Sequence, residues 1–164
     1  MLKFPDGFTP YKKKDADRYN TFRWWSGLTF GDLLDRAADI HPEKEAFVDG
    51  KTRLTYGEAR EKTNRLAIID IMEVYCYQSL VDIFGNVPYS QAVDINNISP
   101  VYDDAFAIYQ DLLTRLDADI AAMDAAYGSF GGNDVFFFGD VGMWIGFANT
   151  LKVRLGISLA DHDA

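Results

Sequence analysis

Several acidic side chains occur in pairs that general acid–base catalysis could use. Asp103 and Asp104 adjoin at the start of a predicted helix, and Asp117 and Asp119 lie further along the same helix. Two carboxylates in different environments can divide the roles of acid and base in a reaction. A helix N-terminus also stabilises negative charge with no catalytic purpose. We therefore interpret both pairs as structural and predict no catalytic residue.

Metal ligation is the second chemistry to consider. His41 precedes Pro42 at a predicted helix end, while His162 lies in a terminal Asp-His-Asp triplet that is interpreted as a polar tail. The single cysteine, Cys76, excludes an internal disulfide and a clustered thiolate site. Its aromatic neighbours favour a small, buried hydrophobic residue at this position. The sequence predicts no metal site and no cofactor.

Aromatic and glycine-rich segments are the remaining candidates for binding. Residues 136–138 are three phenylalanines, which could plug a helix layer or stack on the face of a sugar, and packing is favoured. Trp24 and Trp25 could form a stacking platform for a ligand or pack an irregular arm onto the body of the protein, and packing is again favoured. The stretch YGSFGGN at 127–133 lacks the lysine and threonine of a phosphate-binding loop and is interpreted as a helix-terminating loop. Ligand-binding residues stay unassigned.

Composition limits the classes of function. The chain carries 16 basic against 25 acidic residues, a net charge of −9 that repels phosphate backbones, so no nucleic-acid partner is expected. The 48% hydrophobic content suffices for one domain or two very small ones. No apolar run reaches the roughly 18 residues that span a bilayer. The first residues lack a signal-peptide pattern, so the chain as written is predicted to be cytoplasmic.

A helix and a hairpin are predicted in the first third of the chain. The helix begins after Thr29, the expected N-cap with Asp32 as its capping partner, and Pro42 stops it. Residues 45–49 and 52–56 flank Gly50-Lys51 and are predicted to form a β-hairpin. The expected inward face of the helix holds Phe30, Leu33, Leu34, Ala37, Ala38 and Ile40.

Three longer helices are predicted at 68–84, 103–123 and 140–161, with Asp140 as an N-cap and Gly85 and Gly128 as terminators. The first is apolar on a wide surface, and its pattern also allows one helix over 57–84. Asp111, Arg115 and Asp119 are expected to face water. The expected inner stripes are Ile69, Met72, Cys76, Leu80 and Phe84; then Ala105, Ile108, Leu112, Leu116, Ile120 and Met123; then Trp144, Phe147, Ala148, Leu151, Leu155 and Leu159.

Residues 28–67 read LTFGDLLDRAADIHPEKEAFVDGKTRLTYGEAREKTNRLA. This run resembles the N-terminal segment of adenylate-forming enzymes, and the opening of the chain is most similar to their dihydroxybenzoate–AMP ligase-like branch. The resemblance covers roughly residues 1–67, which are scaffold in that family. The loop and the lysine that such enzymes need for ATP are missing here. No catalytic residue is carried over, and no enzymatic activity is predicted.

A second resemblance rests on three phrases, FGxVPY at 84–89, IYxDLLxxLD at 108–117 and W-x-x-FAN-x-LK-x-RL at 144–155. In this order they resemble the SusD/RagB family of outer-membrane nutrient-binding lipoproteins, over residues 68–161. The resemblance implies a tetratricopeptide-like scaffold, a glycan ligand and a TonB-dependent transporter as partner. Full-length relatives lie on the outer-membrane surface.

Together these observations predict a composite, mainly α protein. A small α+β segment with one β-hairpin, residues 1–67, precedes a three-helix SusD-like scaffold fragment, residues 68–164. The expected function is non-catalytic glycan or nutrient binding. The alternative is the N-terminal remnant of an ATP-dependent acyl- or aryl-acid ligase. Ligand, oligomeric state, the packing of the two segments and the origin of their junction stay open at this point.

Overall fold

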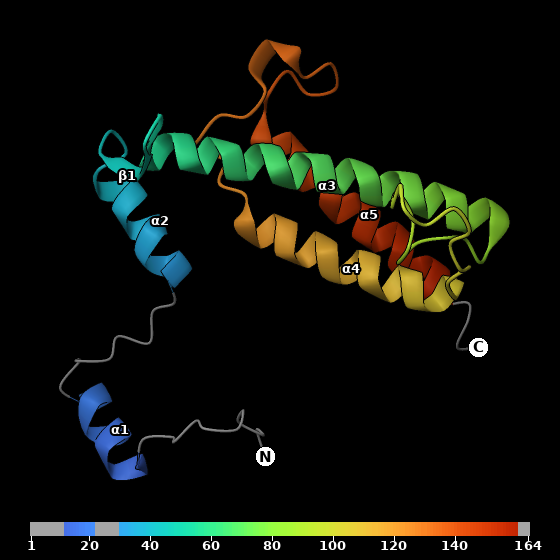
Figure 1. Ribbon diagram of the computed structural model, residues 1–164, viewed down its shortest axis with the longest axis horizontal. Helices are drawn as coiled ribbons and strands as arrows, with labels where there is room; N and C mark the ends of the chain where they lie inside the picture. Colours follow the sequence, from blue (N-terminus) through green and yellow to red (C-terminus); the bar gives the residue numbers. More distant parts are fainter. Residues whose placement is uncertain (1–11, 22–29, 161–164) are drawn as a thin grey trace. The chain divides into compact units, whose positions relative to one another are not determined.

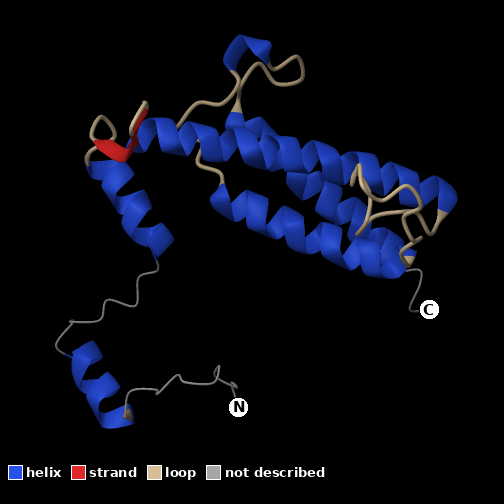
Figure 2. Cartoon of the chain, in the orientation of Figure 1, coloured by secondary structure: helices blue, strands red, loops and turns tan. Residues whose placement is uncertain are grey.

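The computed structural model describes residues 12–21 and 30–160, and the chain divides into two compact units, 1–42 and 43–164. The first unit contains α1 (Lys13–Thr21) and α2 (Phe30–Ile40) (Figures 1 and 2). The predicted helix before Pro42 is confirmed, but the inward positions of Leu33 and Ile40 are wrong, because these side chains are 51% and 58% exposed. Ala38 of the same predicted face is buried, at 1% exposed. The expected cap at 29, the aromatic arm at 24–25 and the polar tail at 161–163 lie outside the described residues.

The second unit opens with the predicted hairpin, β1 (Glu45–Asp49) and β2 (Thr52–Thr55), which pair antiparallel. β2 leads directly into α3 (Tyr56–Phe84) through a capping box. The backbone N–H of Thr55 donates to Glu58 Oε2 at 2.9 Å, and the N–H of Glu58 donates to Thr55 Oγ1 at 3.2 Å. Two donors without helical partners are thus satisfied. The hairpin is fixed to the start of α3.

α3 is one continuous helix, as the alternative pattern over 57–84 predicts, and the expected family boundary at 67/68 falls inside it. It ends at Gly85, whose φ of 72° suits glycine. α4 (Ala105–Ala122) turns back along α3, with Asp104 as its N-cap. α5 (Val141–Ala160) begins directly after Asp140, which accepts a bond from the N–H of Met143 at 3.0 Å. The prediction that Gly128 ends α4 is wrong, because the helix stops at Met123, before that loop.

The core lies between α3, α4 and α5, which pack side by side (Figure 1). The predicted stripes of α4 and α5 are confirmed in their central positions. The buried members of these two stripes are Ile108, Leu112, Leu116, Met123, Trp144, Ala148, Leu151 and Leu155.

The predicted inner stripe of α3 is wrong. Ile69, Leu80 and Phe84 are exposed, and so is Cys76, which was expected to be buried. The other side of the helix faces the core, because α4 and α5 cover that side. Periodicity could not separate two apolar sides of similar strength, and a buried Gln78 interrupts the correct one. The buried side consists of Asn64, Ala67, Ile68, Ile71, Val74, Gln78 and Val81.

Arg115 and Asp119 do not face water as predicted, although Asp111 is exposed. The guanidinium of Arg115 forms ion pairs with Asp70 and, at 3.1 Å, with Glu73, both on α3. It also donates to Tyr89 Oη at 2.8 Å, and its partners hold its pKa above the ordinary value. A charged stripe predicted to be solvated is therefore an interface between two helices.

Candidate functional site

The site begins with the loop between α4 and α5, which is tied to α3 by a buried amide. Asn64 is fully buried, and its Nδ2 donates to the carbonyl oxygens of Asp124, Tyr127 and Gly128 at 2.9, 3.2 and 3.0 Å. Its Oδ1 accepts from the N–H of Asp124 at 2.9 Å. A single side chain thus takes the place of a secondary-structure partner for the loop backbone. Asn64 lies before the boundary that the sequence analysis expects at 67/68 and the loop lies after it, so within unit 43–164 the residues on the two sides of that expected boundary pack together.

The following residues, 129–139, close on themselves. Ser129 Oγ donates to the carbonyl oxygen of Gly139 at 3.1 Å. Gly139 has a φ of 86°, and a Cβ there would lie 2.6 Å from Cα of Gly131. The positive φ and the close approach both require glycine. The short 3₁₀ helix η1 (Gly131–Asn133) lies within this closed loop.

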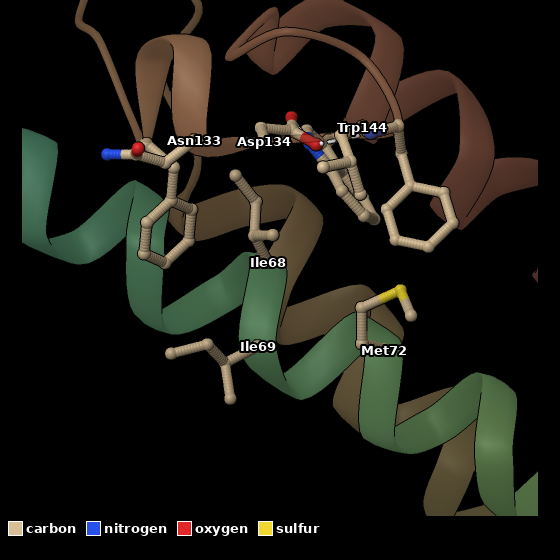
Figure 3. A pocket seen from close by; sticks show the side chains of 9 residues that line it. Ile68, Ile69, Met72, Asn133, Asp134 and Trp144 are labelled. Atoms are coloured by element: carbon tan, nitrogen blue, oxygen red, sulfur yellow. Dashed lines mark hydrogen bonds between the residues drawn. The ribbon is translucent and has the colours of Figure 1, made fainter.

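Asp134 organises the closed loop from inside. This residue is only 6% exposed, and its carboxylate accepts from the backbone N–H groups of Phe136, Phe137 and Gly139 at 2.9, 3.2 and 3.0 Å. The indole Nε1–H of Trp144 donates to it at 2.6 Å (Figure 3). Burial raises the pKa of Asp134, but these hydrogen bonds outweigh it and lower the pKa below the ordinary value. The carboxylate is ionised and fully occupied, so it orients the loop and is not a proton donor.

The loop delivers aromatic rings onto α5 and α3. The ring of Phe137 meets Trp144 edge-to-face at 5.0 Å and Phe147 at 6.0 Å. Phe136 lies 6.0 Å from Trp144, and Tyr75 of α3 lies 5.8 Å from Phe147. Such edge-to-face pairs contribute about 0.5–1.5 kcal/mol each beyond burial. The cluster has a buried base at Trp144 and an exposed rim at Phe136.

Two adjoining hollows open on this cluster, and we call them together the aromatic cleft. They measure about 320 and 260 Å³ and share Met72, Phe136 and Trp144. Figure 3 shows the larger one, bounded by α3 below and by the closed loop above. Its further lining residues are Ile68, Ile69, Phe130, Asn133, Asp134 and Val135, and those of the smaller hollow are Tyr75, Phe137, Phe147 and Arg154.

The packing predicted for the three phenylalanines holds for Phe137 alone. Phe136 is 60% exposed and Phe138 78% exposed, and Phe138 has a positive φ of 55°. The rings of Phe136 and Phe137 contact Trp144, whereas Phe138 lines neither hollow. The sequence analysis missed Asp134. The sequence does contain a signal for it. Asp134 lies two and three residues before Phe136 and Phe137, and an aspartate that accepts backbone N–H groups at this spacing is typical of Asx turns.

The other predicted candidates do not form a reactive site. Asp104 caps α4, and Asp117 forms an ion pair with Lys152. Asp103 accepts bonds from the loop at Tyr89 and Ser90. His41 is exposed after α2. Within residues 12–21 and 30–160, no group of three histidine, cysteine or acidic side chains is placed to hold a metal ion.

Comparison with known proteins places this fold in a family. A family model, SusD-like_2, described as starch-binding associating with outer membrane, matches residues 3–164. The chain belongs to this SusD-like family. A solved SusD-like neighbour, a chitin-binding protein, is 28% identical, with a TM-score of 0.53 over 90% of this chain. The present chain spans 28% of that protein's length.

The adenylate-forming resemblance is confirmed as well. The SusD-like chain is 39% identical over 62 residues to a salicylyl-CoA synthase / salicylate adenylyltransferase from Streptomyces sp, covering 38% of this chain and 11% of that enzyme. It is 42% identical over 67 residues to the 2,3-dihydroxybenzoate-AMP ligase of Bacillus subtilis (strain 168), covering 41% of this chain and 12% of that one. The sequence is therefore a composite of two resemblances within a mainly helical protein.

Proposed function

We propose that this SusD-like chain is a non-catalytic carbohydrate-binding part of a nutrient-uptake protein, and that the aromatic cleft holds the sugar. The observation that carries the proposal is Phe136, whose ring is 60% exposed yet lines both hollows. The family description and the chitin-binding neighbour support a saccharide as the ligand. The expected boundary between the two lineages at 67/68 is part of the same proposal.

The chemistry of the cleft suits a sugar ring. A pyranose has apolar C–H faces that stack on aromatic rings and hydroxyl edges that need polar partners. Phe136 supplies the aromatic face, while Asn133 in the larger hollow and Arg154 in the smaller one supply polar groups at the rims. The larger hollow, 320 Å³, lies at the lower end of the roughly 300–1,000 Å³ typical of ligand pockets, and the smaller one, 260 Å³, falls below that range. Two sugar units, one on each side of Phe136, match this arrangement.

A transporter partner and a place at the outer membrane complete the proposal. The family description names association with the outer membrane, and the SusD/RagB resemblance implies a TonB-dependent transporter. In the described part of the chain, no helix has the length and apolar character needed to cross a bilayer. Pull-down of the protein with detergent-solubilised transporter from a native outer membrane tests the partnership. The outer-membrane location is proposed for the nutrient-uptake protein of which this chain is a part, whereas the cytoplasmic location remains a prediction for the chain as written.

Calorimetric titration with chito- and malto-oligosaccharides tests the ligand. We expect saturable binding of at least one series, weakened about tenfold by Phe136→Ala, which corresponds to ~1.4 kcal/mol. Phe138→Ala is the matched control, because Phe138 is a similarly exposed phenylalanine of the same loop that lines neither hollow. Equal losses in both variants, or no binding by the folded protein, would contradict the proposal.

A ligase remnant is the second candidate function, favoured by the 42% identity over 67 residues. That likeness covers 12% of the enzyme, and we propose that it contributes scaffold without adenylation. ATP–pyrophosphate exchange with salicylate and 2,3-dihydroxybenzoate should stay at background. Exchange above background would make the chain an enzyme.

A further inference from the structure

The smaller hollow of the aromatic cleft contains a cation. Among the described residues that line it, Arg154 alone carries a charge, and aromatic rings make up most of the rest. The larger hollow instead contains Asp134, whose ionised carboxylate already accepts hydrogen bonds from the loop and from the indole. The two hollows therefore differ in the sign of their charge.

Helices α3 and α5 together place this arginine. The ring of Tyr75 on α3 lies 5.8 Å from that of Phe147 on α5. Seven residues further along each helix, Asp82 Oδ2 lies 3.7 Å from Arg154 Nη2. Seven residues make about two helical turns, so both pairs lie on the same faces of the two helices. The second pair therefore crosses from helix to helix beyond the aromatic rings, at the end of the smaller hollow.

The guanidinium of Arg154 has N–H groups that are not hydrogen-bonded within the described part of the chain. The 3.7 Å that separate it from Asp82 fall within ion-pair range but are too long for a hydrogen bond. Asp82 has a donor of its own in the hydroxyl of Tyr109, so it does not depend on the arginine. Half of the Arg154 side chain is exposed, and its planar fork of donors matches a carboxylate. An anionic group entering the hollow therefore finds unused donors.

From this arrangement we propose that the cleft selects an acidic saccharide, with the carboxylate of a hexuronic acid unit bound to Arg154 and a neutral unit in the larger hollow. The inference rests on the proposed saccharide binding and adds the class of sugar. A uronate ring keeps apolar C–H faces that stack on Phe136 and Phe147, and its carboxylate projects from the ring edge. Asp134 would repel an acid group in the larger hollow, so charge also sets the direction of the ligand.

The overall charge of the chain makes this selectivity specific. The net charge of −9 repels an anionic ligand at long range. An acidic saccharide can therefore bind better than its neutral counterpart only where a local cation outweighs that repulsion. The rings that line the smaller hollow keep water from one side of the two charges, which strengthens their attraction.

Calorimetric titration with matched pairs of tetrasaccharides tests the proposal. Each pair consists of an oligomer of galacturonic, glucuronic or mannuronic acid and the same oligomer with its carboxylates reduced to primary alcohols. We expect the acid of at least one pair to bind about tenfold more tightly than its neutral counterpart, because a charge-assisted hydrogen bond is strong. Arg154→Gln should remove this preference.

Three further variants locate the effect. Arg53→Gln makes the same change in net charge on the hairpin, outside both hollows, and should keep the preference. Arg154→Lys keeps the charge without the planar fork and should retain part of the preference. Asp82→Asn removes a competing carboxylate and should increase it. If Arg154 served only as the partner of Asp82, neither Arg154→Gln nor Asp82→Asn would change the ratio of the two affinities.

Several results would overturn the proposal. Neutral saccharides that bind as tightly as every acid would leave the proposed function standing and refute the acidic ligand. A preference that survives Arg154→Gln would place the carboxylate elsewhere. Absence of binding by all saccharides, neutral and acidic, would refute the proposed function together with this inference. Salicylate is titrated as well, and its Arg154-dependent binding without that of any saccharide would assign the hollow to aromatic acids.

Discussion

Two loops connect the three core helices, and they are held in different ways. The loop between α3 and α4, residues 85–104, is held by surface carboxylates and an ion-pair network. The loop between α4 and α5, residues 123–140, is held by two buried polar side chains. The aromatic cleft lies on the second loop. The proposed binding surface is therefore the one whose loop is held by buried polar side chains.

The first loop illustrates anchoring at the surface. Asp103 accepts from the N–H groups of Tyr89 and Ser90 at 2.9 and 2.7 Å, and from Ser90 Oγ at 2.8 Å. The middle of the loop exposes Val93 and Ile98 almost completely, at 98% and 97%. Water can replace most of these hydrogen bonds when they break, so each contributes little.

The second loop illustrates anchoring in the interior. Asn64 and Asp134 are 0% and 6% exposed, and each makes four hydrogen bonds to the loop or its aromatic cluster. Removing either side chain leaves buried groups without partners, which costs more than the bonds themselves contribute.

The largest expected effect is that of Asp134→Ala. It leaves the buried indole N–H of Trp144 and three backbone N–H groups without an acceptor, and we expect a loss of about 2–4 kcal/mol in the free energy of unfolding. Urea denaturation followed by circular dichroism measures it. The control is Asp94→Ala, which removes an exposed carboxylate whose side-chain bonds go to Asn96 alone. Equal losses in the two variants would erase the contrast between the loops.

Asn64→Ala should come second, with a loss of about 2–3 kcal/mol, because three partly buried carbonyl groups and one N–H lose their partner. Asn97→Ala, whose amide bonds are exposed, should change the free energy of unfolding by less than about 0.5 kcal/mol. Hydrogen exchange gives a second measure. The backbone N–H of Asp124 donates to Asn64 Oδ1, so it should lose protection from exchange in Asn64→Ala. Retained protection would contradict the role of Asn64 as an anchor.

The third prediction concerns how stability depends on pH. It rests on Asp119, which neighbours the Asp70 and Arg115 pair that contacts Tyr89. Burial and the neighbouring charge of Asp70 raise the pKa of Asp119 to about 7, although Arg115 opposes this. The Oδ2 atom of Asp119 is buried and accepts no hydrogen bond, which also favours a proton there. The unfolded chain releases that proton near pH ~3.9, so between about 4 and 7 the folded state binds more protons.

Stability should therefore fall as pH rises from about 4 to 7 and level off above. Asp119→Asn, which cannot ionise, should flatten this profile and retain its stability at pH 8. Urea midpoints at a series of pH values measure both proteins. A variant profile that keeps the wild-type slope would assign the slope to other groups.

The smallest effect is expected for Asp103→Ala, because its carboxylate is exposed. Backbone and hydroxyl hydrogen bonds from Ser90 lower the pKa of Asp103, so its contribution is present near neutral pH and lost as pH falls below the ordinary aspartate range. The pKa of Asp134 is also lowered, so its contribution to stability is likewise lost as pH falls, and we expect that loss to be larger. Thermal melts at neutral and acidic pH compare the two variants. A larger loss from Asp103→Ala would reverse the comparison.

Much of the fold follows from the sequence, because local signals and global packing agree there. The predicted terminator Gly85 and the predicted cap Asp140 lie where helices end and begin. The stripe of α5 is also correct, although Met143, Val153 and Ile157 on its other side are apolar and exposed. The three family phrases lead to the right family.

The side of α3 that faces the core could not be predicted in the same way. Both sides are apolar, and the choice depends on where α4 and α5 lie, which is information from distant residues. The same holds for Arg115, whose partners Asp70 and Glu73 lie more than 40 positions earlier in the sequence. The site was missed because Asp134 acts through backbone N–H groups and one indole, and hydrophobic periodicity does not report such bonds.

The central claim is that a saccharide binds in the aromatic cleft held by Asp134. The most direct measurement is the NMR signal of the Trp144 indole N–H, which donates to Asp134 at the base of the cleft. The chain has three tryptophans, and Trp24→Phe and Trp25→Phe assign the signals. Titration with chito- or malto-oligosaccharide should shift the Trp144 signal to saturation, with the midpoint found by calorimetry. Binding that leaves this signal unmoved would contradict the account.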